Sequence, residues 1–259
     1  MAVNVNTVYT TVLYILNKEQ RGYVTPSEFN SIADLVQKEI FNSYFPDGNQ
    51  QNRKNQTNTA NDTEFFNMYK DIAYKLYPFE KEITFTYDAV GDLFYNASAS
   101  VIYKIGEVIT TYTGQPQFDS ITQLVSKKDF SKITRSKLTA PTKQFPLFTT
   151  THGTAAPALD QLVLKISPSP LTNGSVRVNC ITNPTSPNWD FTVGSTLGQY
   201  VFNPVGLGTS SSVDFQLDIS EQTNLIINVL KYFGVIINDP TIVQVAAQEI
   251  KETSINEKS

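Results

Sequence analysis

Residues suited to nucleophilic or acid–base chemistry are scarce in this chain of 259 residues, which has one histidine, His152, and one cysteine, Cys180. Histidine is the usual general base and a common metal ligand, but His152 stands in the turn-like stretch TTTHGTAA beside Gly153. Cys180 falls in a strand-like run, where a lone thiol is typically an inert, half-buried side chain. We therefore expect neither a Cys180–His152 nucleophilic pair nor a structural zinc site.

Paired carboxylates could supply the acid and the base of a glycoside hydrolase. Glu80 with Glu82, and Asp214 with Asp218, have spacings that place both side chains on one face of a strand. Such pairs are usually solvated surface residues. We expect no catalysis from them, and a hydrolase is the function that the sequence supports least.

Two short stretches resemble ligand-binding loops. GLG at 206–208 lacks the next glycine of a phosphate-binding loop, and the sequence contains no GK[ST] motif. Asp47-Gly48-Asn49 resembles a fragment of a calcium loop, but the regular acidic positions and the closing glutamate are missing. We interpret it as a turn. The sequence predicts no catalytic residue, no metal ligand and no cofactor.

The overall charge disfavours one class of function. The chain has 20 basic and 24 acidic residues, a net charge of -4 and a pI near 5.1, which argues against tight, charge-driven binding of nucleic acid. The single cysteine suits a reducing compartment. The N-terminus has no basic segment before its apolar residues, and no eighteen apolar residues run together. We therefore expect neither a signal peptide nor a membrane partner.

Several local signals agree on a helix start near residue 25. Thr25 can accept a hydrogen bond from the N–H of Glu28 while the Glu28 side chain reaches back to Thr25, which is the capping-box pattern. Pro26 fixes φ at the first helical position, and Val24 can pack against Phe29. The sequence predicts an amphipathic helix from here to Pro46-Asp47-Gly48.

Apolar residues of this helix recur at helical spacing and form a stripe: Phe29, Ile32, Val36 and Ile40, widened by Phe41, Tyr44 and Phe45. Further helices are predicted at 7–20 and from Asp62 to Pro78. The polar stretch 49–61 between them predicts a mobile loop.

The middle of the chain favours strands. Residues 82–88 and 100–113 are rich in β-branched and aromatic residues. Residues 119–133 predict a short helix with Ile121, Leu124 and Val125 inward, followed by a proline-broken loop at 138–151. Four more short strands are expected: 159–166, 175–182, 198–205 and 212–219. The pattern is typical of a small antiparallel sandwich or barrel.

Helices return at the C-terminus. Ser220 is the expected cap of a helix that reaches Ile236, and Asp239-Pro240 opens a second helix with Ile242, Val243, Ala246 and Ile250 on one side. The sequence therefore predicts an α+β fold in which N- and C-terminal helices form one helical layer with a β-sandwich or barrel inserted. The expected parts are 1–80, 81–219 and 220–259.

Three segments resemble virion structural proteins of tailed phages, especially crAss-like and marine podovirus-type phages. They are NKEQRGYVTPSEFNSIADLVQKEIFNSYF at 17–45, LTAPTKQFP at 138–146 and KYFGVIINDPTIVQVAAQEIK at 231–251. The resemblance implies a non-enzymatic head-to-tail connector, of the adaptor or ring type, in the neck of a virion assembled in the host cytoplasm. Such a subunit joins capsid to tail beneath the portal and lines or supports the DNA exit channel.

The resemblance also implies partners. They are copies of the chain in a closed, twelve-fold ring, the portal protein, neighbouring ring or tail proteins, and passing double-stranded DNA that is not bound by sequence. The residues expected to pack against subunits or the portal are Phe29, Ile32, Val36, Ile40, Ile242, Val243, Ala246 and Ile250. The alternative is a tail-associated, β-rich module that recognises a receptor or glycan through aromatic residues of its strands.

Overall fold

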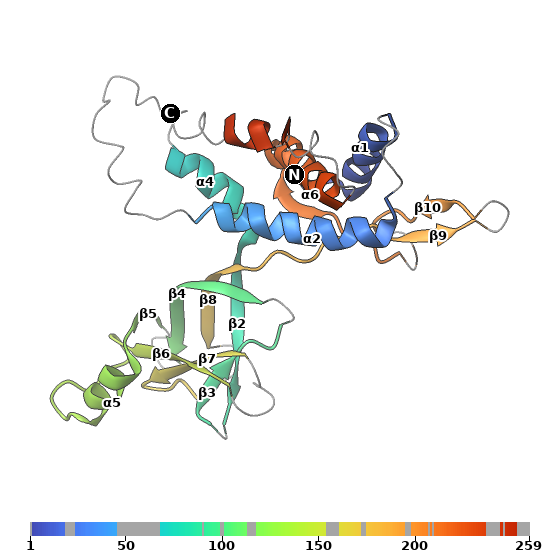
Figure 1. Ribbon diagram of the computed structural model, residues 1–259. Helices are drawn as coiled ribbons and strands as arrows, with labels where there is room; N and C mark the ends of the chain where they lie inside the picture. Colours follow the sequence, from blue (N-terminus) through green and yellow to red (C-terminus); the bar gives the residue numbers. More distant parts are fainter. Residues whose placement is uncertain are drawn as a thin grey trace. The chain divides into compact units, whose positions relative to one another are not determined.

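The computed structural model describes the following residues: 2–18, 24–45, 68–89, 91–98, 101–112, 118–153, 161–171, 175–194, 198–206, 208, 210–236, 244–245 and 247–252. The chain forms two compact units. The helical unit combines Met1–Pro78 with Pro184–Ser259, and the barrel unit is Phe79–Asn183. The fold is α+β, with helices from both ends of the chain and a β-barrel inserted between them in sequence (Figure 1).

Helices from both ends of the chain pack together in the helical unit. They are α1 (Val5–Lys18), α2 (Pro26–Ser43), α4 (Met68–Leu76) and α6 (Gln222–Ile236), and α6 contacts both α1 and α2. Each of these three contributes apolar side chains at steps of three and four residues to a common core. The fully buried members include Val8, Val12, Leu16, Phe29, Val36, Leu225 and Val229.

Short strands and turns complete the helical unit. They are β1 (Ala2–Val3), β9 (Phe191–Val193), β10 (Tyr200–Phe202), β11 (Phe215–Asp218) and the 3₁₀ turn η2 (Ile219–Glu221). A further 3₁₀ turn, η1 (Tyr77–Phe79), leads into the barrel. β1 pairs antiparallel with β11, and β9 with β10. The very start of the chain is thus tied to a strand more than two hundred residues later.

The barrel unit closes seven strands in the order β2-β3-β7-β6-β5-β4-β8. Their bounds are β2 (Glu80–Asp88), β3 (Leu93–Tyr95), β4 (Ile102–Tyr112), β5 (Phe118–Leu124), β6 (Leu147–His152), β7 (Leu162–Ser167) and β8 (Val176–Thr182). All neighbours are antiparallel except β5 and β6, which are parallel. A parallel pair requires a crossover, and α5 (Lys127–Arg135) lies in this one.

The interior of the barrel is apolar because inward positions alternate with outward ones along each strand. The burial pattern of β8 follows this period strictly, with every second residue buried. The core comprises Ile83, Phe85, Phe94, Val108, Phe148, Leu164, Ile166, Val176, Val178 and Cys180.

The helix predicted at 119–133 is wrong in its first half. Residues up to Leu124 form β5, and only Lys127–Arg135 are helical. Ile121 and Leu124 are 66% and 61% exposed, and Ser120 and Thr122 face inward instead. Pairing with β4 and β6 decides the conformation here, and it overrides the local pattern of apolar residues.

Other boundaries also differ from those predicted. Residues 184–219 belong to the helical unit, because β11 pairs with β1 and the Gln216 N–H donates to the side chain of Gln37 in α2. The N-cap before α6 is Asp218, whose carboxylate accepts from the N–H of Ser220. The predicted loop 49–61 and the helix start at 239–240 lie outside the described residues.

Candidate functional site

His152 and Cys180 are not brought together. His152 is the exposed last residue of β6, whereas Cys180 is buried in β8, and two strands, β5 and β4, separate them in the barrel. The Cys180 thiol donates a weak hydrogen bond to the carbonyl oxygen of Lys81 at 3.5 Å. Burial raises the pKa of this thiol, which lowers its thiolate fraction and its nucleophilicity. The pair cannot act as nucleophile and base.

The carboxylate pairs have structural partners. Glu82 lies 3.6 Å from the guanidinium of Arg177, and Asp214 accepts from the N–H of Val5 at 2.9 Å. Asp218 caps η2, and the hydrogen bond from the Ser220 N–H lowers the pKa of its carboxyl. Three of the four carboxylates considered as acid–base groups therefore stabilise the fold.

The ligand-loop fragments gain no support as binding sites. Gly206 and Gly208 have positive φ values of 78° and 57°, as expected of glycines in a turn, whereas Asp47-Gly48-Asn49 lies outside the described residues. Within the described part of the chain, no group of three or more His, Cys, Asp or Glu side chains could hold a metal ion. No helix there has the length and apolar character needed to cross a membrane.

The capping box predicted at the start of α2 is present. The Glu28 N–H donates to Thr25 Oγ1 at 3.4 Å, and the Thr25 N–H donates to Glu28 Oε2 at 2.9 Å. Thr25 Oγ1 also donates to the same carboxylate at 2.7 Å, and this bond lowers the pKa of Glu28. Pro26 occupies the first helical position, and Val24 and Phe29 are both buried.

The apolar stripe of α2 needs a correction. The side chains expected to pack against another subunit, Phe29, Ile32, Val36 and Ile40, are at most 8% exposed within the single chain. They form the core of the helical unit and are unavailable to a partner. Of the C-terminal set, Ile250 is half-buried, while Ile242, Val243 and Ala246 lie outside the described residues.

Different apolar residues of the same helices remain exposed. Leu35 on α2 is 50% exposed, and Tyr14 on α1 is 75% exposed. Tyr74 in α4 and Tyr77 at the start of η1 are each 75% exposed. The sequence pattern could not separate these from core residues, because both kinds fall at helical spacing.

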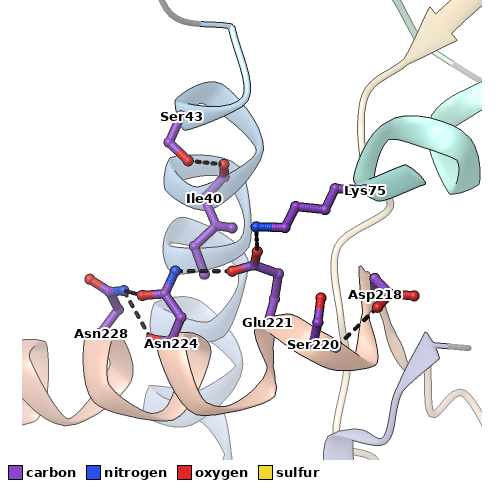
Figure 2. Close-up of polar contacts among 8 residues, drawn as sticks. All are labelled: Ile40, Ser43, Lys75, Asp218, Ser220, Glu221, Asn224 and Asn228. Carbon is purple, nitrogen blue, oxygen red and sulfur yellow. Dashed lines mark hydrogen bonds and ion pairs between the residues drawn. The ribbon is translucent and has the colours of Figure 1, made fainter. Parts of the chain in front are cut away.

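A buried polar network joins α4 to α6, as Figure 2 shows. Lys75 Nζ lies 2.7 Å from Glu221 Oε1, and the Glu221 side chain is 6% exposed. The second carboxylate oxygen accepts from Asn224 Nδ2 at 3.0 Å, and Asn228 Nδ2 donates to Asn224 Oδ1 at 2.8 Å. Removing one partner of such a pair leaves a buried charge unpaired. We interpret the network as a structural clamp.

Gln37 makes a second polar link inside the helical unit. Its side chain is fully buried, donates to the Thr185 carbonyl oxygen at 2.8 Å and accepts from the Gln216 N–H at 3.0 Å. An amide has both a donor and an acceptor, so one side chain satisfies backbone groups of two separate segments. This link fixes the chain leaving the barrel, and β11, to α2.

Trp189 anchors the β9–β10 hairpin to the helices. Its indole N–H donates to Asn6 Oδ1 of α1 at 3.0 Å, and its backbone N–H donates to Asn30 Oδ1 of α2 at 2.8 Å. The indole ring packs against Tyr9 of α1 and against two aromatic residues of the hairpin, Phe191 and Phe202. Aromatic packing and two hydrogen bonds hold the hairpin base in place.

The outer part of the hairpin is apolar and exposed. Val193, Val201 and Tyr200 are 60%, 45% and 39% exposed, and β9 and β10 form a two-stranded sheet with no third strand among the described residues. Figure 1 shows the hairpin extending away from the helices near the N-terminal end of α2. Open strand edges and exposed β-branched side chains favour pairing with another chain.

No protein-family model matches the chain, and no curated protein is detectably similar to it in sequence. The hairpin and the exposed helical residues are therefore identified as candidate binding surfaces from their geometry alone. The sequence predicted a strand at 198–205, which contains β10, but it predicted neither the partner strand β9 nor which helical residues stay exposed.

Proposed function

We propose that the chain is a non-enzymatic structural protein of a tailed-phage virion. In this proposal it is a ring subunit in the head-to-tail connector, lies beneath the portal and supports the DNA exit channel. The resemblance of the three sequence segments suggests this class. The physical support is one observation, the anchored and apolar β9–β10 hairpin.

The hairpin is evidence for assembly because exposed apolar strands with open edges are unfavourable in a monomer. An isolated two-stranded sheet is marginally stable in water, and exposed apolar strands with open edges promote association. Here the base is held by Trp189, while Val193 and Val201 stay exposed. Retaining such an element is reasonable where a partner covers it.

The two exposed apolar regions of the helical unit favour a ring over a two-fold dimer. The hairpin is tied to Asn30 in the first turns of α2, whereas Lys75 of α4 lies over the ring of Tyr44, the C-cap of α2. The 18-residue α2 is about 27 Å long, so the hairpin and Tyr74 belong to opposite ends of it. Contacts between unlike surfaces close into rings when their rotation permits.

Structure determination of the virion neck tests the proposal directly. We expect cryo-electron microscopy of virions that contain the chain to place it in a closed ring beneath the portal, with β9–β10 against a neighbouring subunit. Mass spectrometry of purified virions should detect it in multiple copies. Absence from virions would contradict the proposal, and a distal tail location with glycan binding would favour the receptor-binding alternative.

A variant of the hairpin tests the surface itself. Replacing Val193 and Val201 by serine should prevent incorporation into virions while leaving the folded subunit intact, since both side chains are exposed. The matched control replaces the 95% exposed Leu138 of the barrel by serine and should assemble normally. Normal incorporation of the hairpin variant would remove the hairpin from the assembly interface.

A further inference from the structure

The crossover between β5 and β6 concentrates positive charge. Residues 127–143 contain six basic residues and one acidic residue, in a chain whose net charge is -4. The basic residues are Lys127, Lys128, Lys132, Arg135, Lys137 and Lys143, and all six are exposed. We call these six the basic face.

Four of the six lie on one side of α5. Phe130 is buried and Ile133 and Thr134 are half-buried, so these three mark the face that packs on the barrel. At 3.6 residues per turn, the side chains of Lys127, Arg135, Lys128 and Lys132 fall within an arc of about 140° on the remaining surface. The single acidic residue, Asp129, lies outside that arc and accepts from Ser126 Oγ at the helix cap.

Helix stability explains only part of this pattern. Lys132 and Arg135 lie in the last turn, where cations interact favourably with the helix dipole. Lys127 and Lys128 lie in the first turn, where the same dipole disfavours positive charge. Two lysines are therefore placed against the local electrostatics of their own helix, which suggests that they serve a partner.

Among the described residues, the basic face differs from Arg177 in forming no ion pair. Arg177 on β8 forms ion pairs with Asp119 and Glu82, whereas none of the six basic residues forms an ion pair with a described residue. All six residues are exposed to solvent. Counted by unit, residues 79–183 contain ten basic and eight acidic residues, so the barrel is basic although the whole chain is acidic.

The loop after α5 is held firmly beside the barrel. Ser120 Oγ donates to the carbonyl oxygen of Lys143 at 2.7 Å, and the Gln123 N–H donates to the carbonyl oxygen of Pro146 at 3.0 Å. Lys143 Nζ lies 5.9 Å from the ring centre of Tyr112, whose burial raises its pKa to about 12. The two hydrogen bonds therefore fix the backbone of the loop at Lys143 and Pro146.

We propose that the basic face binds the phosphate backbone of double-stranded DNA without reading its sequence. Lysine and arginine neutralise phosphates and release condensed counterions, which is the main term in non-specific binding. The rise from Lys128 to Lys132 is about 6 Å along the helix, close to two nucleotide steps of about 3.4 Å on one strand. The arc of cations can therefore follow a run of phosphates.

A membrane fits this surface less well than DNA does. A helix that lies on a lipid surface inserts its apolar face between the headgroups. The apolar face of α5 is already used, since Phe130 is 6% exposed against the barrel. The exposed side of α5 carries positive charge, and a polyanion such as DNA complements that charge.

Fluorescence polarisation with a labelled 30-base-pair duplex of mixed sequence tests the proposal. The wild-type chain should bind at 50 mM salt, and log K should fall with log salt by about 0.9 for each phosphate neutralised. The variant Lys128→Glu, Lys132→Glu, Arg135→Glu should bind at least tenfold more weakly and show a shallower slope. A wild-type chain that binds no duplex at 50 mM salt would overturn the proposal.

A charge-matched control separates the basic face from net charge. The variant Lys81→Glu, Lys104→Glu, Lys165→Glu changes the charge of the same barrel equally, outside residues 127–143, and should bind the duplex within about threefold of wild type. Equal losses in both variants would overturn the assignment to α5. Tighter binding to vesicles containing anionic lipid than to the duplex would also overturn it.

A milder variant guards against misfolding. Lys127→Gln with Lys128→Gln removes two charges that oppose the helix dipole, so thermal stability should stay equal or rise while DNA affinity falls about threefold or more. Unchanged affinity would contradict the proposal. The inference does not depend on ring assembly, because DNA binding is measured on the free chain and ring assembly on the virion.

Discussion

The two units fill their interiors in different ways. The helical unit buries long polar side chains, and Glu221, Gln37 and Asn228 are each less than 9% exposed and hydrogen-bonded to partners from other segments or turns. The core cluster of the barrel contains only apolar side chains and one cysteine. Its buried polar residues are mainly threonine and serine, such as Thr122, which donates to the Val108 carbonyl oxygen.

This difference explains how each unit is specified. The helical unit is assembled from segments that are far apart in sequence, and buried amides and an ion pair make one arrangement of those segments preferable to others. The barrel is continuous in sequence and is specified by strand register and alternating side chains. Among the described residues, the charged side chains of the barrel lie at its surface, where Arg177 forms ion pairs and the basic face forms none.

Truncation in the barrel core should give the largest effect. Phe85 is fully buried in the core cluster, so Phe85→Ala should lower the free energy of unfolding by about 3–5 kcal/mol through lost burial and a cavity. Urea denaturation followed by circular dichroism measures this. The control Ile121→Ala, at a 66% exposed position, should change stability by less than about 0.5 kcal/mol. Similar losses in both variants would show that the barrel core is not where the strand pattern places it.

Breaking the buried ion pair should rank second. Lys75→Met leaves the Glu221 carboxylate without its cation and should cost roughly 3 kcal/mol, whereas adding Glu221→Gln should recover part of that loss. The matched control is the exposed pair of Lys38 and Asp34, where Lys38→Met should cost less than about 0.5 kcal/mol. Chemical denaturation of all three variants measures the difference, and equal costs at Lys75 and Lys38 would refute the buried clamp.

Loss of a buried amide should have a smaller effect. Gln37→Leu leaves the Gln216 N–H and the Thr185 carbonyl without their partner, at a cost of about 2 kcal/mol. In the barrel, Thr122→Val keeps the shape and removes one hydroxyl, and should cost about 1 kcal/mol or less. Thermal unfolding compares the two. A larger loss at Thr122 would reverse the comparison between the units.

Helix capping should give the smallest effect and should not distinguish the units. Thr25→Ala removes the side-chain half of the α2 capping box and should cost about 1 kcal/mol, whereas Thr25→Ser should be nearly neutral. Ser126→Ala at the N-cap of α5 should cost a similar amount. Equilibrium unfolding measures both, and a loss above about 3 kcal/mol at Thr25 would mean that the residue contributes more than a cap.

Local signals in the sequence predicted the parts of the fold that local chemistry decides. The start of α2 follows from Thr25, Pro26 and Glu28, whose interactions span three residues. The α+β class and the inserted β region follow from the change in period after Pro78. The sequence left a sandwich and a barrel as alternatives. Choosing between them requires the order of the strands, which no local pattern contains.

Long-range partners decided what the sequence could not predict. Ile121 looks like a core residue but faces outward because β5 is paired on both sides. Glu221 looks like an ordinary first-turn acid, and only the approach of Lys75 from α4 makes it part of a buried pair. The charge of the basic face is visible in the sequence, yet the net charge of the whole chain conceals it.

The pairing of β1 with β11 has a consequence for synthesis. The barrel unit is continuous, from Phe79 to Asn183, so all of its strands are synthesised before the second half of the helical unit. Domains generally fold as units during synthesis. We expect the barrel to fold first. The N-terminal helices cannot bury their apolar stripes until α6 emerges, so they should fold later. A nascent chain arrested after about residue 220 should therefore protect the barrel from protease while α1 and α2 are still cut.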